Sequence, residues 1–157
     1  MKYVHSIAIS AFSKVGEDIE RIRSTLKDLA LLDLEKEKLS FKDTIAKSHD
    51  DKDVHILEIM ITKEGQVNRF LKAFIAKLSD DQRQLVIDQR GSRVDEDCRF
   101  FIRLDKRKLL EENRWWITDS GNCFHIKMAL AAYPVRKEVG EGIVEELFRV
   151  ASAQAKL

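Results

Sequence analysis

Apolar residues recur along this chain with two different periods, which predict strands and helices in turn. A period of two predicts strands at three places, residues 3–12, 35–47 and 98–104, and the nearly all-apolar run at residues 54–61 predicts a central strand. Recurrence at every third or fourth position predicts amphipathic helices over residues 17–32, 62–78 and 134–150. Ser79 and Gln82 form a capping box, which predicts a further short helix that ends at Gly91.

The last third of the chain is predicted to hold a hairpin and a final helix. Asp105 is expected to cap a short helical turn over residues 106–112. The segment Trp115–Thr118 is expected to pair with Cys123–Tyr133 across a four-residue turn. Pro134 breaks that strand and suits the first turn of the last helix. The apolar line of this helix is expected to consist of Val139, Ile143, Leu147 and Val150.

This order of elements predicts a two-layer α/β sandwich. Helices with one apolar face need one face of a sheet to cover. Because short turns join neighbouring strands, the sheet should be antiparallel or mixed, with the helices on one face and the other face partly free. The chain has 157 residues, of which 44% are hydrophobic and 35% charged, and this is typical of one ordinary folded domain over residues 1–157.

No segment of the sequence indicates export or membrane insertion. The first residues run directly into the first predicted strand, and no run approaches about 18 apolar residues. Cys98 and Cys123 lie far apart without a CxxC pattern, which argues against a disulfide framework or a zinc site. A glycine-rich loop of the kind that cradles phosphates is also missing. We therefore expect a cytoplasmic protein without a metal or other cofactor.

Positive charge is concentrated in the second half of the chain. The net charge is only +1, but residues 90–137 contain 11 Lys and Arg against 7 Asp and Glu. Within this segment Arg99, Phe101 and Arg103 alternate with apolar residues of the predicted strand, so they share one face of it. By the same alternation, a neighbouring strand adds Lys127 to that face.

Such a sheet face offers what single-stranded RNA requires, namely cations for phosphates and planar groups on which bases stack. We therefore interpret the chain as a non-catalytic RNA-binding protein. The predicted site also includes five more basic residues of this segment, Arg93, Lys106, Arg107, Arg136 and Lys137. The alternative interpretation is that Phe101 and the arginines lie against a partner subunit, which would make this face a dimerisation or assembly surface.

Three consecutive acidic residues before the charged strand raise a second alternative. Asp95, Glu96 and Asp97 are clustered as the magnesium ligands of a nuclease can be. Consecutive side chains at the entry to a strand diverge, however, and no second carboxylate cluster stands out. We therefore expect Asp95 and Asp97 to orient Arg93 and to cap local turns, and we do not expect an enzyme.

The block SRVDEDCRFFIRLDK, from Ser92 to Lys106, resembles the signature of an archaeal family of RNA-binding proteins that are also described as predicted exosome subunits. The similarity extends to His5, Ala11-Phe12, Glu17-Asp18 and Tyr133-Pro134, so it spans nearly the whole chain. The resemblance implies RNA as the ligand, a homodimer, and an RNA-processing complex as a partner. It also implies a fold like that of ribosomal protein five of the large subunit, and it supplies no catalytic residues.

The chain departs from this family at the turn between the second and third strands. Members often carry a turn similar to Gly-His-Gly-Asn, whereas the segment Ser48–Asp53 retains only a histidine and is more acidic. This difference puts any RNA contact of the turn in doubt.

Overall fold

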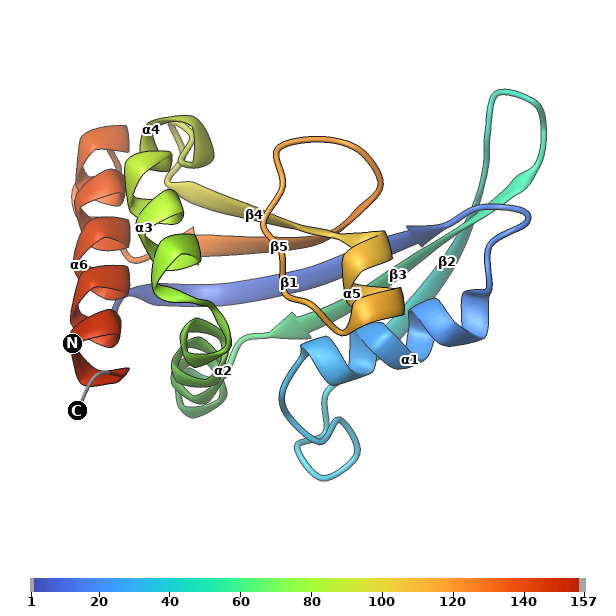
Figure 1. Cartoon of the computed structure of the whole chain (residues 1–157), viewed down its shortest axis with the longest axis horizontal. Helices are drawn as coiled ribbons and strands as arrows, with labels where there is room; N and C mark the ends of the chain where they lie inside the picture. Colours follow the sequence, from blue (N-terminus) through green and yellow to red (C-terminus); the bar gives the residue numbers. More distant parts are fainter. Residues whose placement is uncertain (1, 156–157) are drawn as a thin grey trace. The chain divides into compact units, whose positions relative to one another are not determined.

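A computed structural model of the chain describes residues 2–155, with side chains described over residues 2–149. Its five strands form one antiparallel sheet in the order β2-β3-β1-β5-β4 (Figure 1). The strands are β1 (Val4–Ser13), β2 (Phe41–Lys47), β3 (Asp53–Ile61), β4 (Arg99–Asp105) and β5 (Cys123–Leu130). The described helices are α1 (Ile19–Leu29), α2 (Glu64–Lys77), α3 (Asp80–Asp88), α4 (Arg90–Arg93), α5 (Lys106–Glu112) and α6 (Lys137–Ala155). The predicted α/β class is confirmed, and the sheet is antiparallel.

The described chain divides into two compact units. Unit 1 consists of residues 2–7, 62–102 and 127–155, and it holds α2, α3, α4 and α6. Unit 2 consists of residues 8–61 and 103–126, and it holds β2, β3, α1 and α5. The strands β1, β4 and β5 each contribute residues to both units.

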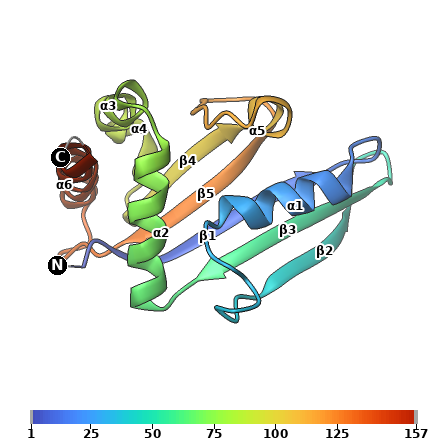
Figure 2. The same ribbon diagram turned by 60° about the horizontal axis from the view of Figure 1, so that its bottom comes forward.

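In unit 2, α1 covers one face of the strands. The Asp18 carboxylate caps this helix by accepting a hydrogen bond from the backbone N–H of Arg21 at 3.1 Å. Of the four apolar residues predicted to line this helix, Ile22, Leu26 and Leu29 are buried, and Ile19 is half-buried. Figure 2 shows α1 on the upper side of β1 and β3, and none of the helices within residues 8–61 and 103–126 covers the opposite face. This unit therefore has an open sheet face.

Two predicted strand segments of unit 2 differ from the structure. The predicted strand over residues 35–47 begins only at Phe41, because residues 34–38 form turns in which Lys38 has a left-handed backbone with φ of 58°. The segment Trp115–Thr118 was predicted to pair with β5, but Ile117 instead bridges Leu104 of β4. That hairpin prediction is wrong, and the segment extends the sheet beyond the edge of β4.

Unit 1 is held together by aromatic side chains and by α6. Phe70 and Phe74 of α2 stack with ring centroids 5.5 Å apart, and Phe100 contacts Phe148 of α6 edge to face at 5.8 Å. The prediction for α6 was partly wrong, because the residues that become buried are Val144, Leu147 and Phe148, whereas Val139 and Ile143 are half-buried. The side chain of Val150 lies outside the described residues.

Two predicted helix boundaries of unit 1 also differ. Gly91 lies inside α4 and does not end the preceding helix, because the chain continues from α3 into a further helical turn. Pro134 lies before α6, which begins at Lys137, so the proline is not in its first turn. Across the part of the chain that is described, none of the helices has the length and apolar composition that crossing a bilayer demands.

Two glycines of α6 provide a matched test of the packing in unit 1. A Cβ added at Gly140 would lie 3.0 Å from Val94 Cγ1 and 3.2 Å from Cys98 Sγ, whereas one added at Gly142 would meet no atom within 4 Å. We expect Gly140→Ala to lower the free energy of unfolding by about 1 kcal/mol, because overpacking outweighs the gain in helix propensity. Gly142→Ala should raise it by roughly 0.5–1 kcal/mol. Chemical denaturation of both variants measures the two changes in the free energy of unfolding. Changes of the same sign would contradict this packing.

Candidate nucleic-acid interface

The alternation predicted for β4 is present in the structure. Arg99, Phe101 and Arg103 are exposed, and the residues between them, Phe100, Ile102 and Leu104, are buried. Arg99 and Phe101 belong to unit 1, and Arg103 belongs to unit 2. Each unit therefore has basic and aromatic side chains of its own.

In unit 1, the exposed face of β4 combines with one side chain of β5. The backbone N–H of Leu130 donates to the carbonyl of Cys98 at 2.9 Å, and this register places Phe101 opposite Lys127. Both side chains are exposed, and 37% of Phe101 is accessible. Arg99 forms an ion pair with Asp97 at 3.2 Å beside them. The predicted trio of Arg99, Phe101 and Lys127 thus lies on accessible surface of this unit.

In unit 2, Arg103 lies opposite a histidine on the neighbouring strand. The backbone N–H of Lys106 donates to the carbonyl of Asn122 at 3.1 Å, and this register places Arg103 across from His125. Burial lowers the pKa of His125, and the positive charges of Arg103 and Lys106 lower it further. His125 is therefore neutral at pH 7, and it contributes a planar ring to this face and no charge.

Phe12 of β1 extends this face beyond His125. The two rings meet edge to face with centroids 5.8 Å apart, and 41% of Phe12 is exposed. A large apolar ring left this accessible on a sheet face offers a flat surface to a ligand. Phe12, His125 and Arg103 come from three different strands of unit 2.

Trp116 lies on the same face, at the edge of the sheet. Asp105 donates its N–H to the carbonyl of Trp116 at 2.8 Å, and Thr118 donates to the carbonyl of Arg103 at 2.9 Å. Because residues opposite one another in a ladder point to the same side, Trp116 and Arg103 share the open face. The guanidinium of Arg114 lies 4.7 Å from the Trp116 ring centroid, and the Lys108 ammonium lies 5.1 Å from it.

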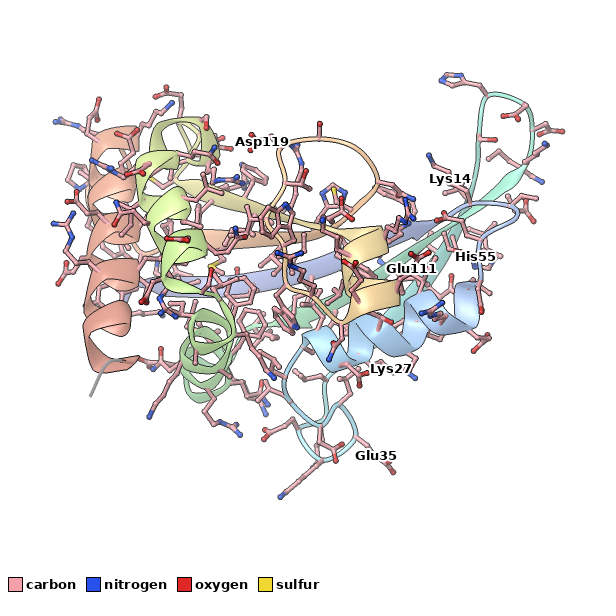
Figure 3. All side chains as sticks on the ribbon, viewed as in Figure 1. Lys14, Lys27, Glu35, His55, Glu111 and Asp119 are labelled. Carbon is pink, nitrogen blue, oxygen red and sulfur yellow. The ribbon has the colours of Figure 1, made fainter. Side chains whose placement is uncertain are left out.

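These residues make up one surface, which we call the unit 2 surface: Phe12, Arg103, Lys108, Arg114, Trp116 and His125. It combines three rings with three cations. Arg103 Nη1 donates to the backbone carbonyl of Asp119 at 3.0 Å, which holds the guanidinium in place while its remaining donors stay available. Asp119 is labelled in Figure 3, on the loop that follows α5. Such a surface can stack bases on its rings and pair its cations with phosphates.

Two residues of the predicted site are buried, and Arg93 is the first. It is 6% exposed, and its guanidinium donates to Gln89 Oε1 at 2.6 Å. A second contact, of 3.5 Å, reaches the carbonyl of Phe101. Arg93 therefore holds α4 against β4 within unit 1 and does not present its charge to a ligand.

Lys106 is the second buried residue, with an exposed fraction of 2%. Its ammonium donates to the carbonyl of Phe12 at 2.6 Å and lies 3.3 Å from Glu17 Oε2. Asn122 also donates to Glu17, at 3.1 Å. Although burial alone raises the pKa of Glu17, hydrogen bonds from Lys14, Asn122 and Lys106 and the charge of Lys106 lower it overall. Lys106 therefore joins separate segments of unit 2 and positions Phe12.

The remaining predicted cations lie on the surface of their units. Arg107 is exposed on α5 and pairs with Glu111, labelled in Figure 3, at 3.1 Å. Arg136 is exposed before α6 in unit 1, and its carbonyl accepts a hydrogen bond from Cys98 Sγ at 3.0 Å. Lys137 is half-buried at the first position of α6. None of these three belongs to the unit 2 surface as defined above.

The acidic run before β4 forms a turn. Asp95 Oδ1 accepts hydrogen bonds from the backbone N–H groups of Asp97 and Arg99, both at 2.9 Å. Asp97 pairs with Arg99, so these carboxylates organise the entry to β4 and cap its turn as predicted. Arg93, which they were expected to orient, donates instead to Gln89 and to the Phe101 carbonyl. Within the described residues, no three His, Cys, Asp or Glu side chains are grouped so that they could hold a metal ion.

The predicted site left out most residues of the unit 2 surface. The sequence places Phe12 in a strand, and strand alternation places one of Trp115 and Trp116 on the basic face without saying which of the two, but nothing local brings Phe12 near β4. Phe12 and His125 are 113 positions apart, and they meet only because β1 and β5 are neighbours in the sheet. The sequence did contain one indication of where Phe12 lies. Phe12 follows Ser10 by two positions, so strand alternation places it on the face opposite the buried residues Ile9 and Ala11.

Known proteins resemble this chain in sequence and in fold. RNA-binding protein PAB1135 of Pyrococcus abyssi is 24% identical over 143 residues, covering 90% of this chain and 92% of that protein. Protein AF2318 of Archaeoglobus fulgidus has a solved structure that matches with a TM-score of 0.79 and 24% identity, covering 92% and 99% of the two chains.

Mth689, a DUF54 protein of Methanothermobacter thermautotrophicus, has a similar structure, with a TM-score of 0.74 and 21% identity, covering 94% of this chain and 99% of that one. These structures establish a shared fold. The three source organisms are archaea, in agreement with the resemblance drawn from the sequence. A family model described as RNA binding matches residues 6–130, which is most of the chain. The chain therefore belongs to this RNA-binding family.

Proposed function

We propose that this chain is a non-catalytic protein that binds single-stranded RNA through the unit 2 surface. The observation that carries the proposal is the grouping of exposed or half-buried rings and cations contributed by β1, β4, α5, β5 and the segment after α5. Phe12, Trp116 and His125 provide rings for base stacking, and Arg103, Lys108 and Arg114 provide positive charge for phosphates. Arg99, Phe101 and Lys127 of unit 1 provide further contacts of the same kind.

Membership of the RNA-binding family supports RNA as the ligand. The preference for single strands follows from the form of the surface, because bases stack on open rings only when they are not already paired in a duplex. No feature of the described residues favours the dimerisation interface or the metal-dependent nuclease as the main function.

Salt dependence tests the electrostatic part of this proposal. The three cations of the unit 2 surface on three phosphates of a single strand should contribute about −2 to the slope of log K against log salt concentration, since each contact contributes about −0.7. Contacts of Arg99 and Lys127 would make the slope steeper. Fluorescence anisotropy with a labelled single-stranded RNA over a salt series measures this slope. Arg103→Ala should make the slope shallower by roughly 0.7. Binding that is insensitive to salt, or equal affinity for a duplex of the same sequence, would refute the proposed mode.

The family resemblance supports further parts of the proposal. We propose that both units act together as one RNA-binding domain, that the protein is a cytoplasmic homodimer, and that it joins an RNA-processing complex such as the exosome. We also propose that the fold is related to that of ribosomal protein five of the large subunit. Native mass spectrometry of the purified chain tests the dimer, and affinity purification from its own cells tests the complex.

A further inference from the structure

A pocket opens between α1 and α5 in unit 2, on the other side of the segment that carries Trp116. Its volume is about 160 Å³, smaller than the roughly 300–1,000 Å³ of pockets that hold drug-sized ligands. It is lined by Thr25, Asp28, Leu29, Leu109, Leu110, Asn113 and Trp115. Lys27 on α1 and Glu111 on α5, labelled in Figure 3, mark the two helices that form it. A single small planar group fits such a space.

The pocket lies beside the unit 2 surface because neighbouring residues of one strand point to opposite faces. Trp116 shares the open face with Arg103, whereas Trp115 points to the helix side and lines the pocket. Arg114, which stacks on Trp116, directly precedes Trp115. A strand of RNA on the open face can therefore place one nucleotide in the pocket by turning around the edge of the sheet.

The pocket contains a carboxylate that has no ion-pair or hydrogen-bond partner within the described residues. Asp28 is exposed in the last turn of α1, where the negative end of the helix dipole disfavours an acidic side chain. Thr25 lies three positions earlier on the same helix face and also lines the pocket. Asn113 follows α5 with a left-handed backbone, with φ of 51°, and its side-chain amide joins the rim. The Asp28 carboxylate therefore contributes no ion pair or hydrogen bond to the described fold.

The chemistry of these groups selects among the four bases. A carboxylate only accepts hydrogen bonds, so its partner must present donors, and two adjacent donors satisfy both of its oxygens. Guanine presents its N1–H and 2-amino group side by side. Adenine and cytosine offer an amino group next to a ring acceptor, and the N3–H of uracil lies between two carbonyls that a carboxylate repels. The Trp115 ring in the lining supplies a planar apolar wall for the base.

We propose that this pocket binds one unpaired guanine base of the RNA, with Asp28 accepting from its Watson–Crick edge and Trp115 packing against its ring. The inference rests on the proposed function, and it adds a specificity-determining site to a surface that otherwise tolerates any sequence. Thr25 and Asn113 bind the remaining polar edge of the base.

The test uses short cytidine oligonucleotides that differ only in one central nucleotide, guanosine, inosine or adenosine. Fluorescence anisotropy should show that the full chain binds the guanosine form about ten-fold more tightly than the adenosine form. Inosine, which lacks the 2-amino group, should fall between them. Asp28→Asn should remove most of this preference while leaving the affinity for the adenosine form unchanged, and its thermal unfolding should show no loss of stability. Glu35→Gln, which removes one exposed carboxylate of the loop after α1, is the matched control and should keep the preference.

The outcomes separate this inference from the proposed function. Equal affinity of the wild type for the guanosine and adenosine forms overturns the guanine site, as does an unchanged preference in Asp28→Asn. If Arg103→Ala still weakens binding of every oligonucleotide in that case, the proposed RNA-binding function stands without the guanine site. If the wild type binds none of the oligonucleotides, both fail. Trp115→Leu provides a second variant, which should lower affinity for the guanosine form more than for the adenosine form.

Discussion

Arg103→Ala is expected to weaken binding of single-stranded RNA about ten-fold and to leave the fold intact. Arg103 is exposed on β4 and is held by one hydrogen bond to the Asp119 carbonyl, so its loss removes a cation and a stacking plane without opening the core. It also lies opposite His125, in the middle of the unit 2 surface. Anisotropy titrations at low salt measure the change in affinity, and circular dichroism checks the fold.

The control for this prediction is Arg149→Ala, which removes the same charge from the exposed face of α6 in unit 1. It should change affinity less than two-fold, because Arg149 is not one of the residues of the unit 2 surface. Arg103→Lys separates charge from shape, because lysine retains the cation and loses the planar guanidinium. Equal losses in Arg103→Ala and Arg149→Ala would mean that only overall charge matters, and this would contradict the assigned surface.

Lys106→Met is expected to lower the free energy of unfolding by about 3 kcal/mol. The substitution preserves the apolar part of the side chain, but it leaves the Phe12 carbonyl and Glu17 without the ammonium that they share. Because Glu17 is partly accessible to water, the loss should lie at the lower end of values for fully buried pairs. Urea denaturation monitored by tryptophan fluorescence measures the effect.

Lys72→Met on the exposed side of α2 is the matched control and should change stability by less than about 0.5 kcal/mol. The double variant Lys106→Met with Glu17→Gln should be less destabilised than the sum of its single changes, because it leaves no unpaired carboxylate. If Lys106→Met is as stable as the wild type and binds RNA more weakly, Lys106 is a ligand contact and the structural assignment is wrong.

The part of the interface that lies within one strand could be predicted from the sequence. The alternation of Arg99, Phe101 and Arg103 with buried residues depends only on the period of a half-buried strand, and the structure has it. The antiparallel sheet and α1 with its buried stripe were predictable for the same reason, because a local pattern determines which face is apolar. Asp105 also caps α5 as predicted, accepting from the backbone N–H of Lys108.

The partners of the charged residues could not be predicted, because they are distant in the sequence. Lys106 looks like one member of a solvated basic run, but the fold brings it to Phe12 and Glu17, which are 94 and 89 positions away. The prediction that Trp115–Thr118 pairs with β5 failed because a short turn favours a local hairpin, whereas the edge of β4 was also free to accept the segment. The same edge pairing places the two tryptophans on opposite sides.

Photocrosslinking of single-stranded RNA to the full chain, with the crosslinked peptides mapped by mass spectrometry, tests the central claim most directly. The unit 2 surface predicts crosslinks in the peptides that contain Phe12, Trp116 and His125, and their loss at high salt. Crosslinks confined to α2, α3 or β2 would contradict it, because those elements contribute no residue to this surface.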